Sequence, residues 1–256
     1  MTAFFHYCDF HSIETIALSC PGWLSPFPGQ LEISAGVQEF FAALASSCSH
    51  NSIRDICIRW GEPDYDRLTH IVGFQPLGLD EFRPLLQLHK LQKLKLFIPR
   101  PMILEDATLL AMADAWPHIS TLLLTESGWY NGPWHSSSYI TPLTILSVLE
   151  RCPKLERLTV RIDFSAIDYA DFDPLSIDVL RIQDCKGALA KLTWLDLGPY
   201  IFAHPRAIAR FLSAVLPDSA RICMLFSAFG DEQAPHDASF RQTIKYMRQM
   251  QREKGE

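Results

Sequence analysis

One pattern recurs along the chain and constrains its fold more than any other feature. An amphipathic helical stretch ends abruptly, and a short run with the spacing Leu-x-x-Leu-x-Leu follows. In the stretch ERCPKLERLTV, the helical spacing stops at Cys152-Pro153, and Leu155, Leu158 and Val160 then take the alternate spacing of a strand. A single such switch would be a local accident, whereas a switch that recurs in phase indicates a repeating unit.

The strand pattern has further copies on both sides of this stretch. They begin at Ile13, Ile53, Leu91, Ile119 and Leu192, and a weaker copy begins at Ser219. Most copies follow a stretch with apolar residues three and four positions apart, which predicts one buried face of a helix. These predicted helices include VQEFFAALASSC, ATLLAMADAWP, TPLTILSVLERCP and PRAIARFLSAVLP.

Proline marks the end of three of the predicted helices, at Pro117, Pro153 and Pro217. Proline cannot continue a helix, and it biases the preceding residue toward extended geometry. Two residues after each of these prolines the strand pattern begins. The prolines therefore predict fixed boundaries between a helix and the strand that follows it.

Stacked helix-strand units would bury a continuous core between a parallel sheet and a row of helices. The copies begin 27 to 40 residues apart, whereas leucine-rich repeats run roughly 20–29 residues. The longer units therefore need loops, which the segments 61–76, 127–138 and 163–178 supply. We expect an α/β open solenoid of irregular leucine-rich-repeat-like units over residues 1–235, followed by an amphipathic basic helix over residues 236–256.

Composition is consistent with a soluble, folded, intracellular protein. The chain has 256 residues, 48% of them hydrophobic, and a net charge of −6. No apolar run approaches the roughly 18 residues that span a membrane, and no secretory signal is recognisable at the N-terminus. The seven cysteines are scattered, mostly within apolar runs, which favours free thiols in the cytoplasm or nucleus. The negative net charge argues against nucleic acid as a partner.

Two longer stretches carry a resemblance to a known family. They are SSYITPLTILSVLERCPKLERLTVRID and LTWLDLGPYIFAHPRAIARFLSAVLPDSARI. Together with the Trp116-Pro117 and Cys152-Pro153 helix ends, they resemble the C-terminal region of fungal F-box proteins with leucine-rich-repeat-like tails. The resemblance covers residues 77–226. It implies a repeat tail that holds partner proteins for a ubiquitin ligase.

The chain departs from this family at its N-terminus. An F-box opens with Leu-Pro and a pattern of three helices, whereas MTAFFHYCDFHSIETIAL predicts a strand unit, and the chain's Leu-Pro lies at Leu216-Pro217. The resemblance therefore implies the repeat tail without a recognisable F-box. Docking to a ligase adaptor is not carried over.

The strand pattern also predicts which side chains face away from the helices. Side chains alternate along a strand, so the third and fifth positions of each copy, and the residue after the sixth, should lie on the open face of the sheet. These positions hold five basic and two acidic residues. We expect a partner-binding surface there, although Lys and Arg on an exposed sheet can also serve only to keep it hydrated. Its candidate residues are Arg59, Lys93, Lys95, Phe97, Arg157, Arg161 and Trp194.

A loop rich in Gly and Ser concentrates further candidates. It holds Trp129, Tyr130, Trp134 and His135. Trp and Tyr are common anchors of protein interfaces, so the loop is a second candidate for partner binding. The alternative is a loop that folds back and buries its own rings.

Other polar clusters do not make a recognisable site. His6, Cys8 and His11 fall short of the four ligands of a structural zinc site, and the aspartates of 163–184 lack the spacing of a calcium loop. No phosphate-binding loop, Gly-x-Ser-x-Gly or His-Glu-x-x-His motif is present. We therefore expect no catalytic residues, no metal and no cofactor.

The C-terminal stretch ASFRQTIKYMRQMQREKGE places Phe240, Ile244 and Met247 on one helical face and basic residues along another. It fits a cap over the last repeat, and its basic face could bind an acidic surface.

The sequence thus predicts a non-enzymatic protein-binding module with a protein partner that carries an acidic segment. Helix-strand alternation also fits a Rossmann-like hydrolase or transferase, and a repeat relic without a binding function is a further alternative. Strand order separates the first two, because a solenoid has no switch point where the order of the strands reverses.

Overall fold

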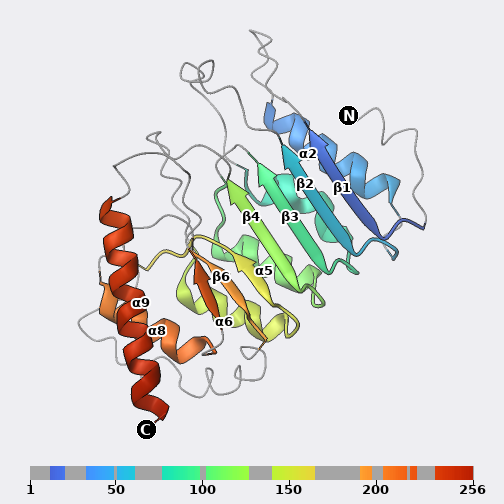
Figure 1. Cartoon of the computed structure of the whole chain (residues 1–256). Coiled ribbons are helices and arrows are strands. Elements are labelled where there is room, and N and C mark those ends of the chain that lie inside the picture. The colour runs from blue at the N-terminus through green and yellow to red at the C-terminus, as the bar shows by residue number, and fades with distance from the viewer. Residues whose placement is uncertain are drawn as a thin grey trace. The chain divides into compact units, whose positions relative to one another are not determined.

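The structure is a computed structural model, and its contacts divide the chain into two compact units, Met1–Tyr139 and Ile140–Glu256 (Figure 1). The structure describes residues 12–20, 33–48, 51–60, 77–98, 102–126, 140–164, 191–197, 204–217, 220–223 and 234–255.

The first unit contains a parallel sheet whose strands are ordered as in the sequence. Each strand pairs with the next one along the chain, in register and without a crossover. The strands are β1 (Thr15–Cys20), β2 (Asp55–Trp60), β3 (Lys93–Ile98) and β4 (Thr121–Glu126). Helical segments α2 (Ile33–Ser47), α4 (Leu79–Phe82), η1 (Arg83–Gln87) and α5 (Asp106–Ala115) lie together on one side of these strands (Figure 1).

The core of this unit lies between the helices and one face of the sheet. Along β3, Leu94, Leu96 and Ile98 are at most 1% exposed, while the residues between them are exposed or half-buried. From the helical layer, Phe41 of α2 stacks on Phe82 of α4 with ring centroids 6.0 Å apart. Alternate burial follows from the two-residue period of a strand.

The second unit repeats the arrangement with shorter strands. Strands β5 (Arg157–Thr159), β6 (Trp194–Asp196) and β7 (Arg221–Cys223) are parallel and again pair in sequence order. Its helices are α6 (Pro142–Arg151), α8 (Pro205–Val215) and α9 (Ala234–Gly255), and α9 packs against α8. The buried residues Leu158 and Leu195 are register partners at the centre of the sheet.

One tight turn recurs between helix and strand. The C-cap residues of η1, α5 and α6 are Leu88, Trp116 and Cys152. The carbonyl oxygen of each accepts a hydrogen bond from the backbone N–H three residues later, at 3.0 Å in all three cases. The first and last residues of each turn are at most 1% exposed. The second position holds Pro117 and Pro153 in two turns but His89 in the third. The turn therefore does not require proline.

A second backbone feature recurs at the start of the strands. The carbonyl oxygen of the residue before one strand accepts two N–H groups from the beginning of the next: Glu14 accepts from Arg54 and Asp55, and Arg54 accepts from Gln92 and Lys93. Gln92 and Glu156 do the same for Ser120 and Thr121 and for Thr193 and Trp194, at 2.7 to 3.2 Å. Strands β2, β3, β4 and β6 therefore begin in the same way, whereas at β7 the Thr193 carbonyl accepts only the Arg221 N–H, at 2.9 Å.

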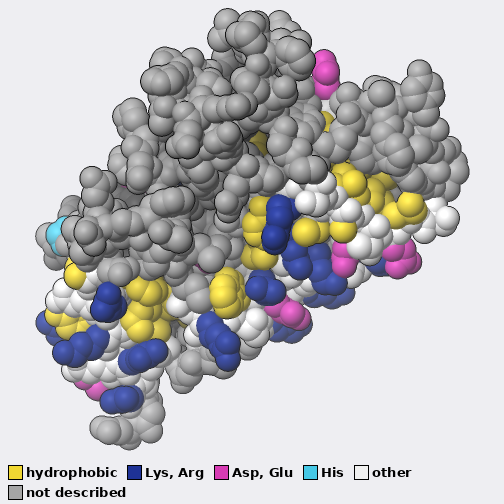
Figure 2. All heavy atoms as spheres, turned by 45° about the horizontal axis from the view of Figure 1, so that its top comes forward, with side chains coloured by type: hydrophobic (Ala, Val, Ile, Leu, Met, Phe, Trp, Pro, Cys, Tyr) yellow, Lys and Arg dark blue, Asp and Glu magenta, His cyan; other side chains and the backbone are white. Residues whose placement is uncertain are grey.

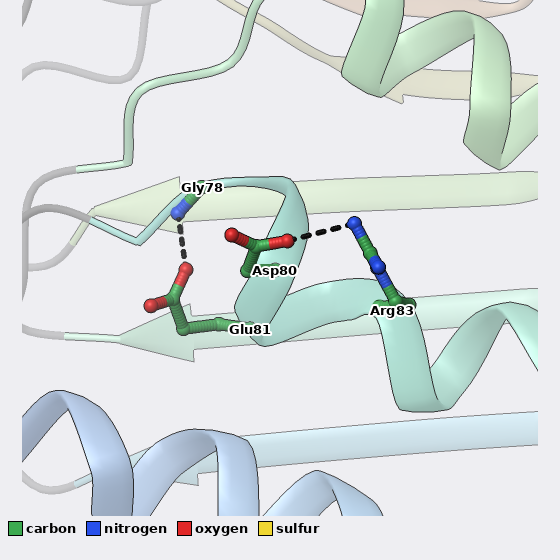
Figure 3. Close-up of polar contacts among 4 residues, drawn as sticks. All are labelled: Gly78, Asp80, Glu81 and Arg83. Atoms are coloured by element: carbon green, nitrogen blue, oxygen red, sulfur yellow. Dashed lines mark hydrogen bonds and ion pairs between the residues drawn. The ribbon is translucent and has the colours of Figure 1, made fainter.

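Helix α4 begins with half of a capping box (Figure 3). The Glu81 carboxylate accepts a hydrogen bond from the Gly78 N–H at 2.8 Å, which satisfies the donor just outside the helix. Gly78 has no side chain to return a bond to the Glu81 N–H. The neighbouring ion pair of Asp80 with Arg83, at 2.8 Å, is formed by side chains that are 75% and 69% exposed, so it adds little stability.

The α/β class with a parallel sheet, predicted from the sequence, is confirmed. The helices predicted to stop at Pro117, Pro153 and Pro217 have their last residues at Ala115, Arg151 and Val215, one residue before each C-cap. In neither unit do the described strands reverse their order, so no switch point of the Rossmann type occurs among them.

Candidate functional site: the open face of the strands

The open face of the first unit is formed by alternate residues of β1 to β4, on the side of the sheet away from the buried leucines. Strand register places these residues in three rows across the sheet. The rows are Thr15, Asp55, Lys93 and Thr121; Ala17, Cys57, Lys95 and Leu123; and Ser19, Arg59, Phe97 and Thr125. On the face seen in Figure 2, Lys and Arg side chains lie beside hydrophobic ones over these strands.

In the first row, a carboxylate neutralises one of the predicted cations. Lys93 Nζ lies 2.8 Å from Asp55 Oδ2 on the adjacent strand, with the two side chains 46% and 27% exposed. Cross-strand register partners of opposite charge favour such pairing. Lys93 was predicted to attract an acidic partner, but its charge is already balanced within the protein.

The second row holds a cation of a different kind. Lys95 is half-buried between its register partners Cys57 and Leu123. Within the described part of the chain, Lys95 forms no ion pair. Its charge therefore lies in a row of weakly polar and apolar neighbours, where a carboxylate from outside would meet little competition.

In the third row an arginine stacks on an aromatic ring. The Arg59 guanidinium carbon lies 4.9 Å from the centre of the Phe97 ring, its register partner on β3. A guanidinium held over a ring keeps its N–H groups directed outward in a fixed plane. Such an arginine is oriented in advance to bind a carboxylate through two hydrogen bonds.

The open face becomes less accessible toward β4. Thr121 is 5% exposed and Leu123 is 9% exposed, although the alternation rule predicted both on an open surface. In the described structure the Thr125 hydroxyl is buried without a hydrogen-bond partner. The accessible part of the open face therefore lies over β1 to β3.

The second unit repeats the pairing of an arginine with a ring. Arg157 of β5 lies over the Trp194 ring of β6, with 5.2 Å between the guanidinium carbon and the ring centre. Arg221 of β7 is the register partner of Trp194 on its other side and is exposed. Arg161 follows β5 and is half-buried. Arg221 was missed as a candidate, although it occupies the third position of the weak strand pattern that begins at Ser219.

Two predicted open-face residues of this unit are instead buried. Thr159 is 7% exposed and Asp196 is fully buried. Asp196, one of the two acidic residues expected on the open face, is therefore not accessible to a partner. The half-buried positions that this face offers are Arg157 of β5, Arg161 after β5 and Trp194 of β6.

Several sequence candidates lie outside the described residues. These are the loop residues Trp129, Tyr130, Trp134 and His135, the histidines and cysteine at positions 6, 8 and 11, and most of the acidic segment 163–184. Within the described ranges, no three His, Cys, Asp or Glu side chains are placed to hold a metal ion. No described helix is both long and apolar enough to cross a membrane.

Comparison with models of known protein families, and with curated proteins, finds no match for this chain.

Proposed function

We propose that the protein is a non-enzymatic binding module of the leucine-rich-repeat-like solenoid class. It holds an acidic segment of a partner protein on the open face of β1 to β3, in the manner of the substrate-recognition tails of F-box proteins in ubiquitin ligases. The solenoid assignment is supported by the sequential strand order, the recurring turn, and the carbonyl oxygens that accept two N–H groups in both units.

The observation that carries the proposal is a pair of open-face cations that form no ion pair with any carboxylate among the residues the structure describes. Arg59 is oriented by Phe97, and Lys95 lies one row away between Cys57 and Leu123. Arg59 and Lys95 lie on neighbouring strands and one row apart. With strands about 4.8 Å apart and rows about 6.6 Å apart, their Cα atoms are about 8 Å apart, within reach of two carboxylates of one extended peptide. Exposed charges this close act together within the screening length of about 8 Å at physiological salt.

An enzyme is the second candidate, and the described residues offer it less support. Rossmann-like enzymes bind substrates where the order of the strands reverses, and the described strand pairs follow the sequence. Three ion pairs are seen among the described residues: Asp55 with Lys93, Asp80 with Arg83, and Glu14 with Arg54. The first two are at 2.8 Å, and Asp80 and Arg83 lie within one helical turn. Glu14 and Arg54 are 3.8 Å apart, with side chains that are 67% and 44% exposed.

A display library of random peptides tests the proposal without knowledge of the natural partner. The full chain is the bait, and the charge-reversed variant Arg59→Glu/Lys95→Glu is the counter-selection bait. We expect enrichment of peptides rich in Asp and Glu with interspersed apolar residues. Their affinity should fall by about tenfold or more in the variant, because two attractive charge pairs become repulsive.

A cysteine on the open face provides a direct readout of the binding position. Cys57 is half-buried beside Lys95, whereas Cys48 and Cys152 are buried. A bound peptide should slow alkylation of Cys57 and leave the buried thiols unchanged. The control variant Lys154→Glu/Lys191→Glu changes the net charge equally at exposed positions away from the open face and should bind as the parent does.

The proposal is wrong if the selected peptides carry no excess of acidic residues. It is also wrong if they bind the Arg59→Glu/Lys95→Glu variant as tightly as the parent, or if they leave the alkylation of Cys57 unchanged.

A further inference from the structure

A row of cations runs along one face of the long C-terminal helix in the second unit. Arg241, Lys245, Arg248 and Arg252 are all exposed and follow one another at spacings of four, three and four residues. This spacing keeps side chains on a single stripe of a helix. We call these four residues the basic stripe. Figure 2 shows Lys and Arg side chains gathered along this helix, at the lower left of the view.

A groove of about 740 Å³ lies against the basic stripe. Its described lining includes the four cations together with Phe240 and Ile244, which are half-buried. From Phe240 to Glu253 the lining extends for about 20 Å, at a rise of roughly 1.5 Å per residue. The described wall of this groove lies entirely on α9 and combines a long, partly apolar surface with a line of positive charge.

Cations outnumber carboxylates on the helix that carries the stripe. Helix α9 carries five Lys or Arg and two Asp or Glu, in a chain whose net charge is −6. Among the described lining residues Glu253 carries the only carboxylate, and that group accepts a hydrogen bond from Gln249 at 2.9 Å. Lys245, Arg248 and Arg252 form no ion pair within the described structure. Like charges three and four residues apart repel one another and destabilise a helix.

Helix α9 packs against α8. On α9, Thr243 is 0% exposed and Met247 is 6% exposed, so the face that holds these two residues is already covered. This differs from the stripe of Phe240, Ile244 and Met247 expected from the sequence, because the helix is rotated to bury Thr243. A helix that lies in a membrane surface inserts its broad apolar face into the lipid. In α9 that face is not available, which argues against a bilayer as the partner of the basic stripe.

We propose that the basic stripe and its groove bind an acidic amphipathic helix of a partner protein. A helix with carboxylates at spacings of three and four residues presents them on one stripe, in register with the four cations, as charged flanking positions pair in a coiled coil. Apolar residues beside those carboxylates would contact Phe240 and Ile244. This surface is separate from the open face and does not depend on the proposed function.

A synthetic helical peptide tests the proposal with the full chain. The probe carries four Glu at spacings of four, three and four residues, with Leu on the adjoining stripe. A second peptide of identical composition has its Glu residues distributed around the helix. We expect the first peptide to bind about tenfold more tightly than the second, a difference of about 1.4 kcal/mol, and its affinity to fall as salt rises.

Two matched variants separate the basic stripe from general charge. Lys245→Glu/Arg248→Glu/Arg252→Glu should lower the affinity of the first peptide by about tenfold or more, since three exposed pairs become repulsive. Lys154→Glu/Lys191→Glu/Arg206→Glu makes the same change in net charge at exposed positions outside the stripe and should bind as the parent does. Circular dichroism of both variants checks that the helices remain formed.

Other results would overturn the proposal. One is equal binding of the two peptides, or of the first peptide to parent and stripe variant. Another is stripe-dependent binding of phosphatidylserine vesicles or duplex DNA that is tighter than that of the peptide at the same salt. A third is self-association of the parent that the stripe variant loses, seen by analytical ultracentrifugation, which would make a second copy of the chain the partner.

Discussion

At the scale of single residues, the open face depends on which side chains are already paired inside the protein. Lys93 and Arg59 look alike in the sequence as cations at open-face positions. In the structure Asp55 neutralises Lys93, whereas Phe97 orients Arg59 without removing its charge. A count of basic residues on the open face therefore overstates the positive charge that is available to a partner.

The cap of α4 gives a stability prediction at this scale. Gly78→Ser would complete the capping box, because a serine oxygen can accept from the Glu81 N–H. The position has φ −123°, which suits any residue, and an added Cβ would lie 3.8 Å from Glu81 Oε2. We expect the free energy of unfolding to rise by about 0.5–1 kcal/mol, measured by urea denaturation.

Gly78→Ala is the matched control for this change. It removes the same backbone freedom but supplies no hydroxyl, and alanine is a poor N-cap residue. A gain in Gly78→Ala equal to that in Gly78→Ser would show that the hydroxyl forms no cap.

At the scale of elements, one turn joins helix to strand and recurs with the same hydrogen bonds. Its end residues are buried, and its second residue is exposed and variable: His89, Pro117 and Pro153 occupy it. The buried ends therefore make the turn specific, and proline contributes mainly by restricting the unfolded chain.

This division of roles predicts a contrast between neighbouring residues. Pro153→Ala should lower the free energy of unfolding by about 1 kcal/mol or less, since His89 shows that the turn forms without proline. Leu155→Ala should cost about 2–5 kcal/mol, because it leaves a cavity at a residue with no exposed surface. Thermal melts of both variants check the contrast, and a larger loss for Pro153→Ala would contradict it.

The strands carry an equivalent prediction. Leu122, Leu158 and Leu195 are at most 2% exposed at the same position of β4, β5 and β6. Replacement of any one by Ala should lower the free energy of unfolding by about 2–5 kcal/mol, as measured by chemical denaturation. If all three variants unfolded at the same denaturant concentration as the parent, these strands would not form the core.

At the scale of the whole molecule, the chain consists of two compact units, each with a parallel sheet whose strands follow the sequence. Such sheets have contacts mainly between neighbouring elements, which is the property of repeat proteins. Each unit presents an arginine over an aromatic ring on adjacent strands. Binding surfaces can therefore be tested unit by unit.

The cysteines provide a prediction about the whole chain and its compartment. We expect all seven to be free thiols in a reducing compartment. Thiol counting in denaturant without reductant should recover seven, and recovery of one would indicate disulfides and a secreted protein. In the native protein, mass spectrometry should find Cys57 alkylated before Cys48 and Cys152, because the latter are buried.

The sequence by itself determined the α/β class, the positions of the helix ends, and the inward leucines of each strand. These follow from local rules: the periods of helix and strand differ, and proline stops a helix. Arg59 and Phe97 occupy the same position of successive copies of the strand pattern, and so do Arg157 and Trp194. In the structure the members of each pair are register partners on neighbouring strands.

Only the tertiary structure decided which of these positions a partner can reach. Asp196, Thr121 and Leu123 are buried on the predicted open face, and the period of a strand carries no information about whether a face of the sheet is covered. The same holds for α9, which packs against α8 and buries Thr243, while Phe240 is only half-buried. Several rotations of an amphipathic helix bury similar apolar area, so contact with the neighbouring helix determines which one forms and leaves the basic stripe exposed.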